Sequence, residues 1–253
     1  MLITGGSGFL GQAICRAIAA EGARPVVHYR SRPEEAKRIA AETGGIALHA
    51  DLTSETQAAG LFAEIDRRVG GLDGCVCCAG VRPAARKSLS DMSLSDWHAS
   101  CSDNLVMTFL TAREFLRRLD NRRDTSLVLI GSSSDIYGHP GRAGFAAAKS
   151  AISFGLLQSL TDELAQICPG GRVNAISPGF MEVVGDTRSS DSGTDRSDVM
   201  AVSALPRPAA PDDVAYAAIW LISPVASASV TGRIWRIDAG QSGRIRRKDP
   251  RPE

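Results

Sequence analysis

The fold is indicated by residues 1–11, which read Met1-Leu2-Ile3-Thr4-Gly5-Gly6-Ser7-Gly8-Phe9-Leu10-Gly11. A short apolar run predicts a buried strand, and the residues from Leu10 to about Glu21 predict an amphipathic helix. A G-x-x-G-x-x-G pattern between a strand and a helix indicates a phosphate-binding turn. Gly5 permits the tight turn, Gly8 lets a backbone approach a pyrophosphate, and Gly11 allows close packing of the helix. By itself the motif is weak evidence for dinucleotide binding, because glycines also occur in ordinary turns.

The rest of the chain continues the alternation of strand and helix. Further strands are predicted at 25–29, 46–49, 72–78, 126–130, 172–176 and 233–237, and helices at 33–43, 55–69, 95–119, 143–166 and 212–222. Ser54 and Gln57 predict a capping box for the helix that starts at residue 55. This order predicts an α/β fold, a single Rossmann-type, doubly wound parallel sheet with helices on both faces.

The domain boundaries follow from composition. Residues 1–243 are expected to form one nucleotide-binding domain without internal repeats or a linker. The polar stretch of about 181–210 is too long for a simple connector and predicts a lid over a site. Residues 244–253 are basic and rich in proline, which predicts a flexible tail.

Composition excludes several function classes. A net charge of +1 over 253 residues argues against a general nucleic-acid or membrane-surface role. With no signal-like segment and no membrane-length apolar run, we expect a cytoplasmic protein whose six cysteines are reduced. Cys75-Val76-Cys77-Cys78 lies in an apolar run without a second ligand pair, so we interpret these as buried strand thiols and expect no metal site.

Cofactor preference is suggested after the second strand. Arg30-Ser31-Arg32 stands where the ribose 2′-group of a dinucleotide would lie, and no acidic residue follows until Glu34. Guanidinium groups bind a phosphate with charge-assisted hydrogen bonds, whereas a 2′-hydroxyl calls for a carboxylate. The triplet favours NADP(H) over NAD(H); the alternative is that these arginines are solvated at the start of a helix.

Features spaced along nearly the whole chain resemble the short-chain dehydrogenase/reductase superfamily, and most closely its compact ketoreductase branch. They are Thr4-Gly5 to Gly11, Asp51-Leu52, Ala79-Gly80, Asn104 seven residues after Trp97, Ser132 thirteen before position 145, Lys149, residues 173–179, Asp213-Val214-Ala215, and Thr231-Gly232 to Asp238-Ala239-Gly240. The number of motifs in register supports the fold more strongly than any one of them.

The resemblance implies a role for each matching residue. Asp51 and Leu52 would contact the adenine, Lys149 the nicotinamide ribose, and the backbone of 178–181 the carboxamide. The cofactor site would comprise Gly5, Ser7, Gly8, Phe9, Leu10, Arg30, Ser31, Arg32, Asp51, Leu52, Cys78, Ala79, Gly80, Lys149, Pro178, Gly179 and Met181. Ser132 would bind the substrate oxygen, and Asn104 would break its helix locally to hold a water near Lys149.

The sequence also departs from the family pattern. Phe9 replaces the middle glycine of the compact branch, and Cys77-Cys78 replaces an asparagine pair. Above all, Phe145 stands where the family has a tyrosine whose hydroxyl protonates the substrate oxygen. A positioned general acid contributes roughly 10²–10⁴-fold to a rate, and phenylalanine cannot donate a proton.

Three functions remain open. The first is an NADPH-dependent reductase of a ketone on an aromatic, polyketide-like molecule of secondary metabolism, such as antibiotic biosynthesis. Its proton would come from the substrate's own phenol, from water or from Tyr137. The second is a non-catalytic NADP(H)-binding sensor or assembly protein, and the third is a lyase, dehydratase or isomerase without net redox chemistry.

Three side chains in the loop after Ser132 are candidate donors with ordinary alternatives. Tyr137 could instead pack in the loop with its hydroxyl in solvent, and Asp135 and His139 are expected at the loop surface. The catalytic set is therefore Ser132, Lys149, Asn104 and Tyr137. By resemblance, the helices at 95–119 and 143–166 would form the contacts of a homodimer or homotetramer.

Overall fold

The computed structural model describes residues 1–83, 85–119, 124–181 and 201–241. Seven parallel strands pair in the order β3-β2-β1-β4-β5-β6-β7. Their bounds are β1 (Leu2–Ile3), β2 (Val26–Tyr29), β3 (Ile46–His49), β4 (Gly74–Cys77), β5 (Thr125–Ile130), β6 (Gly171–Pro178) and β7 (Ile234–Ile237). The predicted doubly wound α/β sheet is confirmed.

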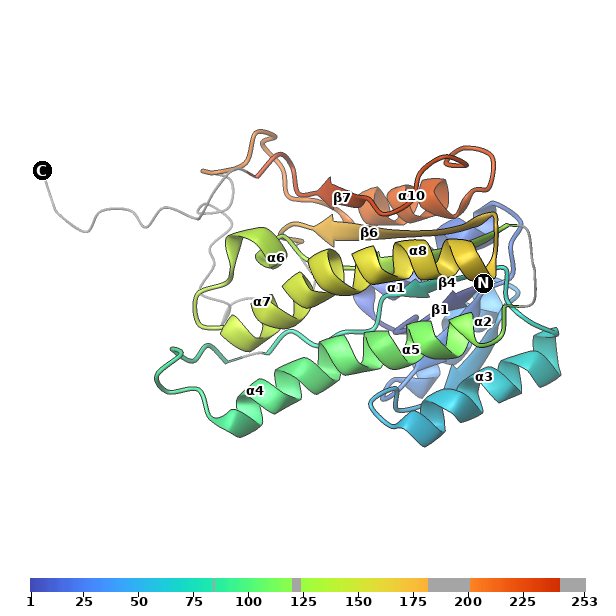
Figure 1. Ribbon diagram of the computed structural model, residues 1–253, viewed down its shortest axis with the longest axis horizontal. Helices are drawn as coiled ribbons and strands as arrows, with labels where there is room; N and C mark the ends of the chain where they lie inside the picture. The colour runs from blue at the N-terminus through green and yellow to red at the C-terminus, as the bar shows by residue number, and fades with distance from the viewer. Residues whose placement is uncertain (84, 120–123, 182–200, 242–253) are drawn as a thin grey trace, which may run out of the picture.

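Helices cover both faces of the sheet and make two hydrophobic cores. One face packs against α3 (Glu55–Val69), α5 (Met107–Leu116) and α8 (Leu157–Ile167), and α5 and α8 lie in front of the sheet in Figure 1. The other face packs against α1 (Phe9–Ala20), α2 (Pro33–Glu42) and α10 (Pro211–Ile222). Because both faces are covered, every residue of β5 and β6 is buried.

The two long predicted helices are each interrupted by a π-helical segment. The first runs through α4 (Leu94–Cys101), η1 (Ser102–Val106) and α5. The second runs through α7 (Ala143–Ser150), η2 (Ala151–Leu156) and α8. The family resemblance implied a local break at Asn104, and η1 contains that residue. Single π turns within helices are frequent at functional sites.

Local details correct two expectations. Ser54 accepts a hydrogen bond from the Gln57 backbone N–H at 3.4 Å, but the Gln57 side chain accepts from the Asp51 N–H instead of closing the box. The prediction of a reciprocal capping box was therefore half wrong. Residues 134–137, predicted as loop, form the short helix α6 (Ser134–Tyr137). Cys75 and Cys77 are buried in β4, as predicted, whereas Cys78, predicted as a third buried strand thiol, follows the strand and is only partly buried.

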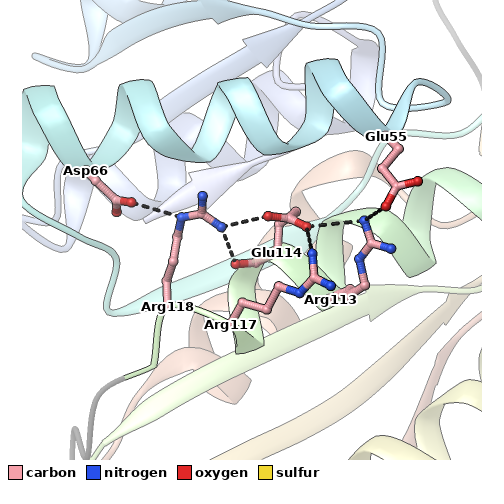
Figure 2. Close-up of polar contacts among 6 residues, drawn as sticks. All are labelled: Glu55, Asp66, Arg113, Glu114, Arg117 and Arg118. Carbon is pink, nitrogen blue, oxygen red and sulfur yellow. Dashed lines mark hydrogen bonds and ion pairs between the residues drawn. The ribbon is translucent and has the colours of Figure 1, made fainter.

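An ion network fastens α3 to α5, and Figure 2 shows its six members. The Glu114 carboxylate, with 3% of its side chain exposed, contacts three arginines of the same chain segment: Arg113 at 3.3 Å, Arg117 at 2.9 Å and Arg118 at 2.7 Å. Across the interface, Arg113 contacts Glu55 and Arg118 contacts Asp66. Burial opposes ionisation of Glu114, but hydrogen bonds from Arg118 and Arg117 hold the pKa of its carboxyl below the ordinary value.

The ends of the proposed lid are held by backbone contacts. Met181 forms an isolated parallel bridge with Ala209, and the N–H groups of Ala204 and Leu205 donate to the Ala239 carbonyl. Residues 182–200 and the tail from 244 lie outside the described residues. Within the described part of the chain, no helix is long and apolar enough to cross a membrane.

Candidate dinucleotide and catalytic site

The glycine turn connects β1 to α1 and is held by close contacts. Gly5 has φ +65°, and a Cβ there would lie 2.9 Å from the Ala79 Cα. A Cβ on Gly11 would lie 2.2 Å from the Gly5 carbonyl oxygen, so no larger residue fits without moving the turn. Gly8 is the N-cap of α1, and no side chain caps that end. The turn thus offers uncapped helix amides, which attract phosphate groups.

His28 of β2 joins this turn to the segment after β3. The Gly5 N–H donates to its Nδ1 at 3.0 Å, and its Nε2 lies 3.0 Å from the Ala50 carbonyl oxygen. Burial lowers the pKa of the imidazole to about 4, so the ring is neutral at pH 7. The sequence interpretation gave His28 no role, although a polar residue within the apolar run Val26-Val27 was a signal that it needs buried partners.

Asp51, the residue that the resemblance places at the adenine, follows β3. Its Oδ1 accepts from the Thr53 N–H at 3.0 Å and from the Thr53 hydroxyl at 2.7 Å, and these bonds help to hold the pKa of the carboxyl below its ordinary value. Arg30 Nη1 lies 2.9 Å from the Asp103 carboxylate and 3.8 Å from that of Asp51. Asp103, a partner the sequence did not reveal, therefore holds Arg30 beside Asp51. Ser31 and Arg32 are exposed where α2 begins.

The segment after β4 passes between the turn and the catalytic residues. The Ala79 N–H donates to the Thr4 hydroxyl at 3.0 Å, which ties it to the end of β1. A Cβ on Gly80 would lie 2.9 Å from Asn104 Oδ1 and 3.3 Å from Lys149 Nζ. The side chains of Asn104 and Lys149 therefore converge on Gly80, as the sequence interpretation expected of the two residues.

Asn104 and Lys149 are both buried polar residues. The Asn104 amide donates to the carbonyls of Val81 and Ser100 at 3.0 Å each, while its Oδ1 has no hydrogen-bond partner among the residues that the structure describes. Lys149 Nζ donates to the Ile130 carbonyl at 2.8 Å. Burial lowers the pKa of its ammonium to about 8. A buried, perturbed ammonium beside an unsatisfied amide oxygen is typical of a functional site.

Phe145 stands where the family resemblance predicts a tyrosine. It is 7% exposed, and Lys149 Nζ lies 5.8 Å from the centroid of its ring. The half-buried Ser132 follows β5, and its Oγ accepts from the Ser134 N–H at 3.2 Å. The structure therefore places an aromatic ring, a hydroxyl and an ammonium around the C-terminal end of β5.

The three candidate proton donors after Ser132 are more buried or more firmly hydrogen-bonded than the sequence predicted. The Tyr137 hydroxyl donates to the Gln241 carbonyl at 2.7 Å, so it does not point into solvent, and Arg236 stacks 4.6 Å from its ring. Asp135 is buried, not at the loop surface, and its Oδ2 accepts hydrogen bonds from Ser153 and Ser177. His139 is half-buried, and burial and nearby arginines lower its pKa to about 4.

The end of β6 completes this edge of the sheet. The Pro178 carbonyl accepts from the Ser133 N–H at 2.8 Å, and the Gly179 N–H donates to Ile237 at 2.9 Å. Together with the segments that follow β1, β3, β4 and β5, it lies at the C-terminal ends of the parallel strands, where α/β sheets bind their ligands. These features fit a nicotinamide dinucleotide: the glycine turn, the uncapped start of α1, and the side chains of Lys149 and Asn104 that converge on Gly80. Within the described ranges no cluster of three His, Cys, Asp or Glu side chains could hold a metal ion.

Fold and site together define an α/β dinucleotide-binding protein of the oxidoreductase type. A family model described as enoyl-(acyl carrier protein) reductase matches residues 7–242. The chain belongs to this family of the short-chain dehydrogenase/reductase superfamily, whose members use nicotinamide cofactors.

Three relatives illustrate the similarity. The chain is 32% identical to a 3beta-hydroxysteroid dehydrogenase 1 of Eggerthella lenta, covering 96% of this chain and 93% of that protein. It is 31% identical to a 3-oxoacyl-[acyl-carrier-protein] reductase of Aquifex aeolicus (94% and 95% covered) and 31% identical to an acetoacetyl-CoA reductase of Allochromatium vinosum (94% and 96% covered). These similarities support an oxidoreductase that acts on keto groups.

Proposed function

We propose that this protein is an NADPH-dependent ketoreductase that reduces a ketone on an aromatic, polyketide-like molecule without a tyrosine acid. The observation that carries the proposal is the group around Lys149: the ammonium and the Asn104 amide converge while Phe145 fills the tyrosine position. A site that had lost its purpose would have no reason to keep a buried ammonium, because burial of an unpaired charge is costly.

The chain's own residues account for most of the steps. A bound reduced nicotinamide supplies the hydride. Ser132 donates a hydrogen bond to the substrate oxygen, and Lys149 places a positive charge where negative charge develops on that oxygen. The Phe145 ring keeps water from the side of the site where the tyrosine hydroxyl would lie.

The proton at the substrate oxygen comes from the substrate's own phenol or from water. Tyr137 is less suited, because its hydroxyl already donates to the Gln241 carbonyl. A phenol next to the ketone carries an internal hydrogen bond to the carbonyl oxygen and stabilises the developing charge. A substrate of this kind needs no acid from the protein.

Matched pairs of aromatic ketones, with and without a hydroxyl next to the carbonyl, test this assignment through NADPH oxidation at 340 nm. We expect turnover of the hydroxylated member at least tenfold above that of its partner. Tyr137→Phe should retain turnover within a few-fold, whereas Ser132→Ala should lose at least tenfold. Tight NADPH binding without oxidation on any ketone would instead identify a sensor or assembly protein, and product formed without nicotinamide oxidation would identify a lyase or isomerase.

The preference for NADP(H) is supported by Arg30 beside Asp51 and by the exposed Arg32. Replacing both with Ala should weaken NADPH binding at least tenfold more than NADH binding, because only NADPH carries the 2′-phosphate. Arg24→Ala is the matched control, since Arg24 donates to Gly44 before β3 starts, away from the strand ends that form the site. Equal losses of affinity for NADPH and NADH would contradict the proposal that these arginines bind the 2′-phosphate.

The assembly is proposed to be a homodimer or homotetramer formed through α4–α5 and α7–α8. Val106, Phe109 and Phe154 support this because they are large apolar side chains exposed on these helices. Light scattering during size-exclusion chromatography measures the mass directly. Phe109→Asp combined with Phe154→Asp should yield monomers, and an unchanged mass would place the contacts elsewhere.

A further inference from the structure

His28 is a buried polar side chain in an apolar strand that contacts the dinucleotide turn. It is 3% exposed, and its neighbours Val26 and Val27 are fully buried in β2. Its side chain extends from the Gly5 N–H to the Ala50 carbonyl, and its own carbonyl accepts from the Gly6 N–H at 2.8 Å. A single residue therefore makes three hydrogen bonds to two of the segments that form the cofactor site.

These hydrogen bonds determine which imidazole nitrogen carries the proton. A backbone N–H can only donate, so the Nδ1 that faces Gly5 must be the unprotonated nitrogen. A backbone carbonyl can only accept, so the Nε2 that faces Ala50 must carry the hydrogen. The neutral Nε2–H tautomer satisfies both partners, whereas the other tautomer and the imidazolium would each place two N–H groups against one another at Gly5.

The two segments that His28 joins both belong to the candidate cofactor site. Gly5 is the positive-φ residue of the turn and lies against Ala79. Ala50 directly precedes Asp51, the residue expected at the adenine. The position of the turn relative to Asp51 therefore depends on the length and protonation of this side chain.

We propose that His28 is a positioning residue for the dinucleotide, holding the glycine turn and the Ala50–Asp51 segment in register through its neutral Nε2–H tautomer. The inference rests on the family's nicotinamide cofactor and not on the ketone substrate. It predicts a loss of affinity for the adenosine half of the cofactor when the Gly5 bond is removed.

Burial keeps His28 neutral over the working range. It lowers the pKa of the imidazole most, the Ala50 hydrogen bond opposes this, His49 and Arg30 lower the pKa further, and Asp51 raises it. The exposed His98 of α4 lies outside this region.

Nitrogen-15 NMR of the cofactor-free protein tests the tautomer directly. We expect one buried histidine with unprotonated Nδ1 and protonated Nε2 that does not titrate between pH 8 and pH 5. A protonated Nδ1, or titration of His28 near its ordinary pKa, would overturn the proposal whatever reaction the protein catalyses.

Variants test the positioning role, with ADP and NADPH as probes and binding followed by calorimetry and nicotinamide fluorescence. His28→Asn places an amide oxygen near the Nδ1 position and can still accept from Gly5, whereas His28→Gln extends toward Ala50. We expect His28→Asn to bind ADP within about threefold of the wild type, and His28→Gln and His28→Leu to bind at least tenfold more weakly. Nicotinamide mononucleotide, which lacks the adenosine, should bind all four proteins equally.

His98→Asn is the control variant and should bind like the wild type. If His28→Leu binds ADP as tightly as the wild type, the proposal fails. If His28→Leu does not fold, the contrast between His28→Asn and His28→Gln decides, and equal affinities for ADP in these two variants would also contradict it.

Discussion

Two buried charges on the same face of the sheet differ in their surroundings. Glu114, with 3% of its side chain exposed, is contacted by three arginines, of which Arg113 also pairs with Glu55 and Arg118 with Asp66 (Figure 2). Lys149, 5% exposed, donates to a neutral carbonyl and lies over the Phe145 ring. The pKa of the Glu114 carboxyl is lowered, which favours its charged form. The pKa of the Lys149 ammonium is lowered to about 8, which favours its neutral form.

The difference separates a structural charge from a functional one. A buried charge that is fully paired and hydrogen-bonded holds two elements together. A buried charge without such pairing costs free energy, and active sites are where such groups are retained. We therefore expect substitutions at Glu114 to lower stability and leave cofactor binding intact. Substitutions at Lys149 should leave stability intact and impair cofactor binding or turnover.

The largest effect is expected from Lys149→Met. Turnover of a ketone substrate should fall by about 10²–10³-fold, because the charge beside the reacting oxygen is removed. The melting temperature should stay the same or rise, because an apolar side chain of similar length replaces a buried ammonium. Calorimetric melting and NADPH oxidation measure the two quantities, and a large drop in melting temperature would place Lys149 with the structural charges.

Phe145→Tyr should raise turnover by about tenfold or more on ketones that lack a neighbouring phenol. The new hydroxyl would lie beside Lys149 and could act as the missing acid. Ketones with an internal phenol should gain less, because they already stabilise the developing charge. An equal gain on both members of a substrate pair would mean that the substrate's phenol plays no part.

Glu114→Ala should destabilise the protein by about 2–3 kcal/mol in urea unfolding. This is below the ~3–5 kcal/mol typical when one partner of a buried pair is removed, since its arginines are partly exposed and can rehydrate. Affinity for ADP should not change. Glu34→Ala, which removes an exposed helix pair with Lys37, should leave the unfolding free energy nearly unchanged and is the control.

The dependence of stability on pH also separates the two charges, which act at opposite ends of the pH scale. The pKa of Glu114 is lowered on folding, so its contribution is present at neutral pH and is lost as the pH falls below its ordinary pKa of 4.5. The pKa of Lys149 falls from 10.5 to about 8, so the unfolded chain binds more protons between these values and stability rises with pH across that window.

At ~1.4 kcal/mol for each pKa unit, the Lys149 contribution amounts to about 3 kcal/mol. The difference in unfolding free energy between the wild type and Lys149→Met should therefore shift in favour of the wild type between pH 8 and pH 10.5. A difference that stays constant with pH would show that the ammonium has its ordinary pKa in the folded protein.

The sequence by itself determined the fold and predicted a candidate site. The glycine pattern after a short apolar run, the strand and helix alternation, and the spacing of Asn104, Ser132 and Lys149 are local signals, because backbone conformation and periodicity are encoded within a few residues. The presence of Phe145 where the resemblance predicts a tyrosine is likewise read from the sequence alone.

Only the tertiary structure decided how side chains distant along the chain are paired. Arg30 meets Asp103 across 73 positions, and the Tyr137 hydroxyl meets Gln241 across 104. Asp135 is buried because Ser153 and Ser177 approach it from other elements, and the tautomer of His28 follows from Gly5 and Ala50. Such contacts depend on the packing of whole elements, which no local pattern specifies.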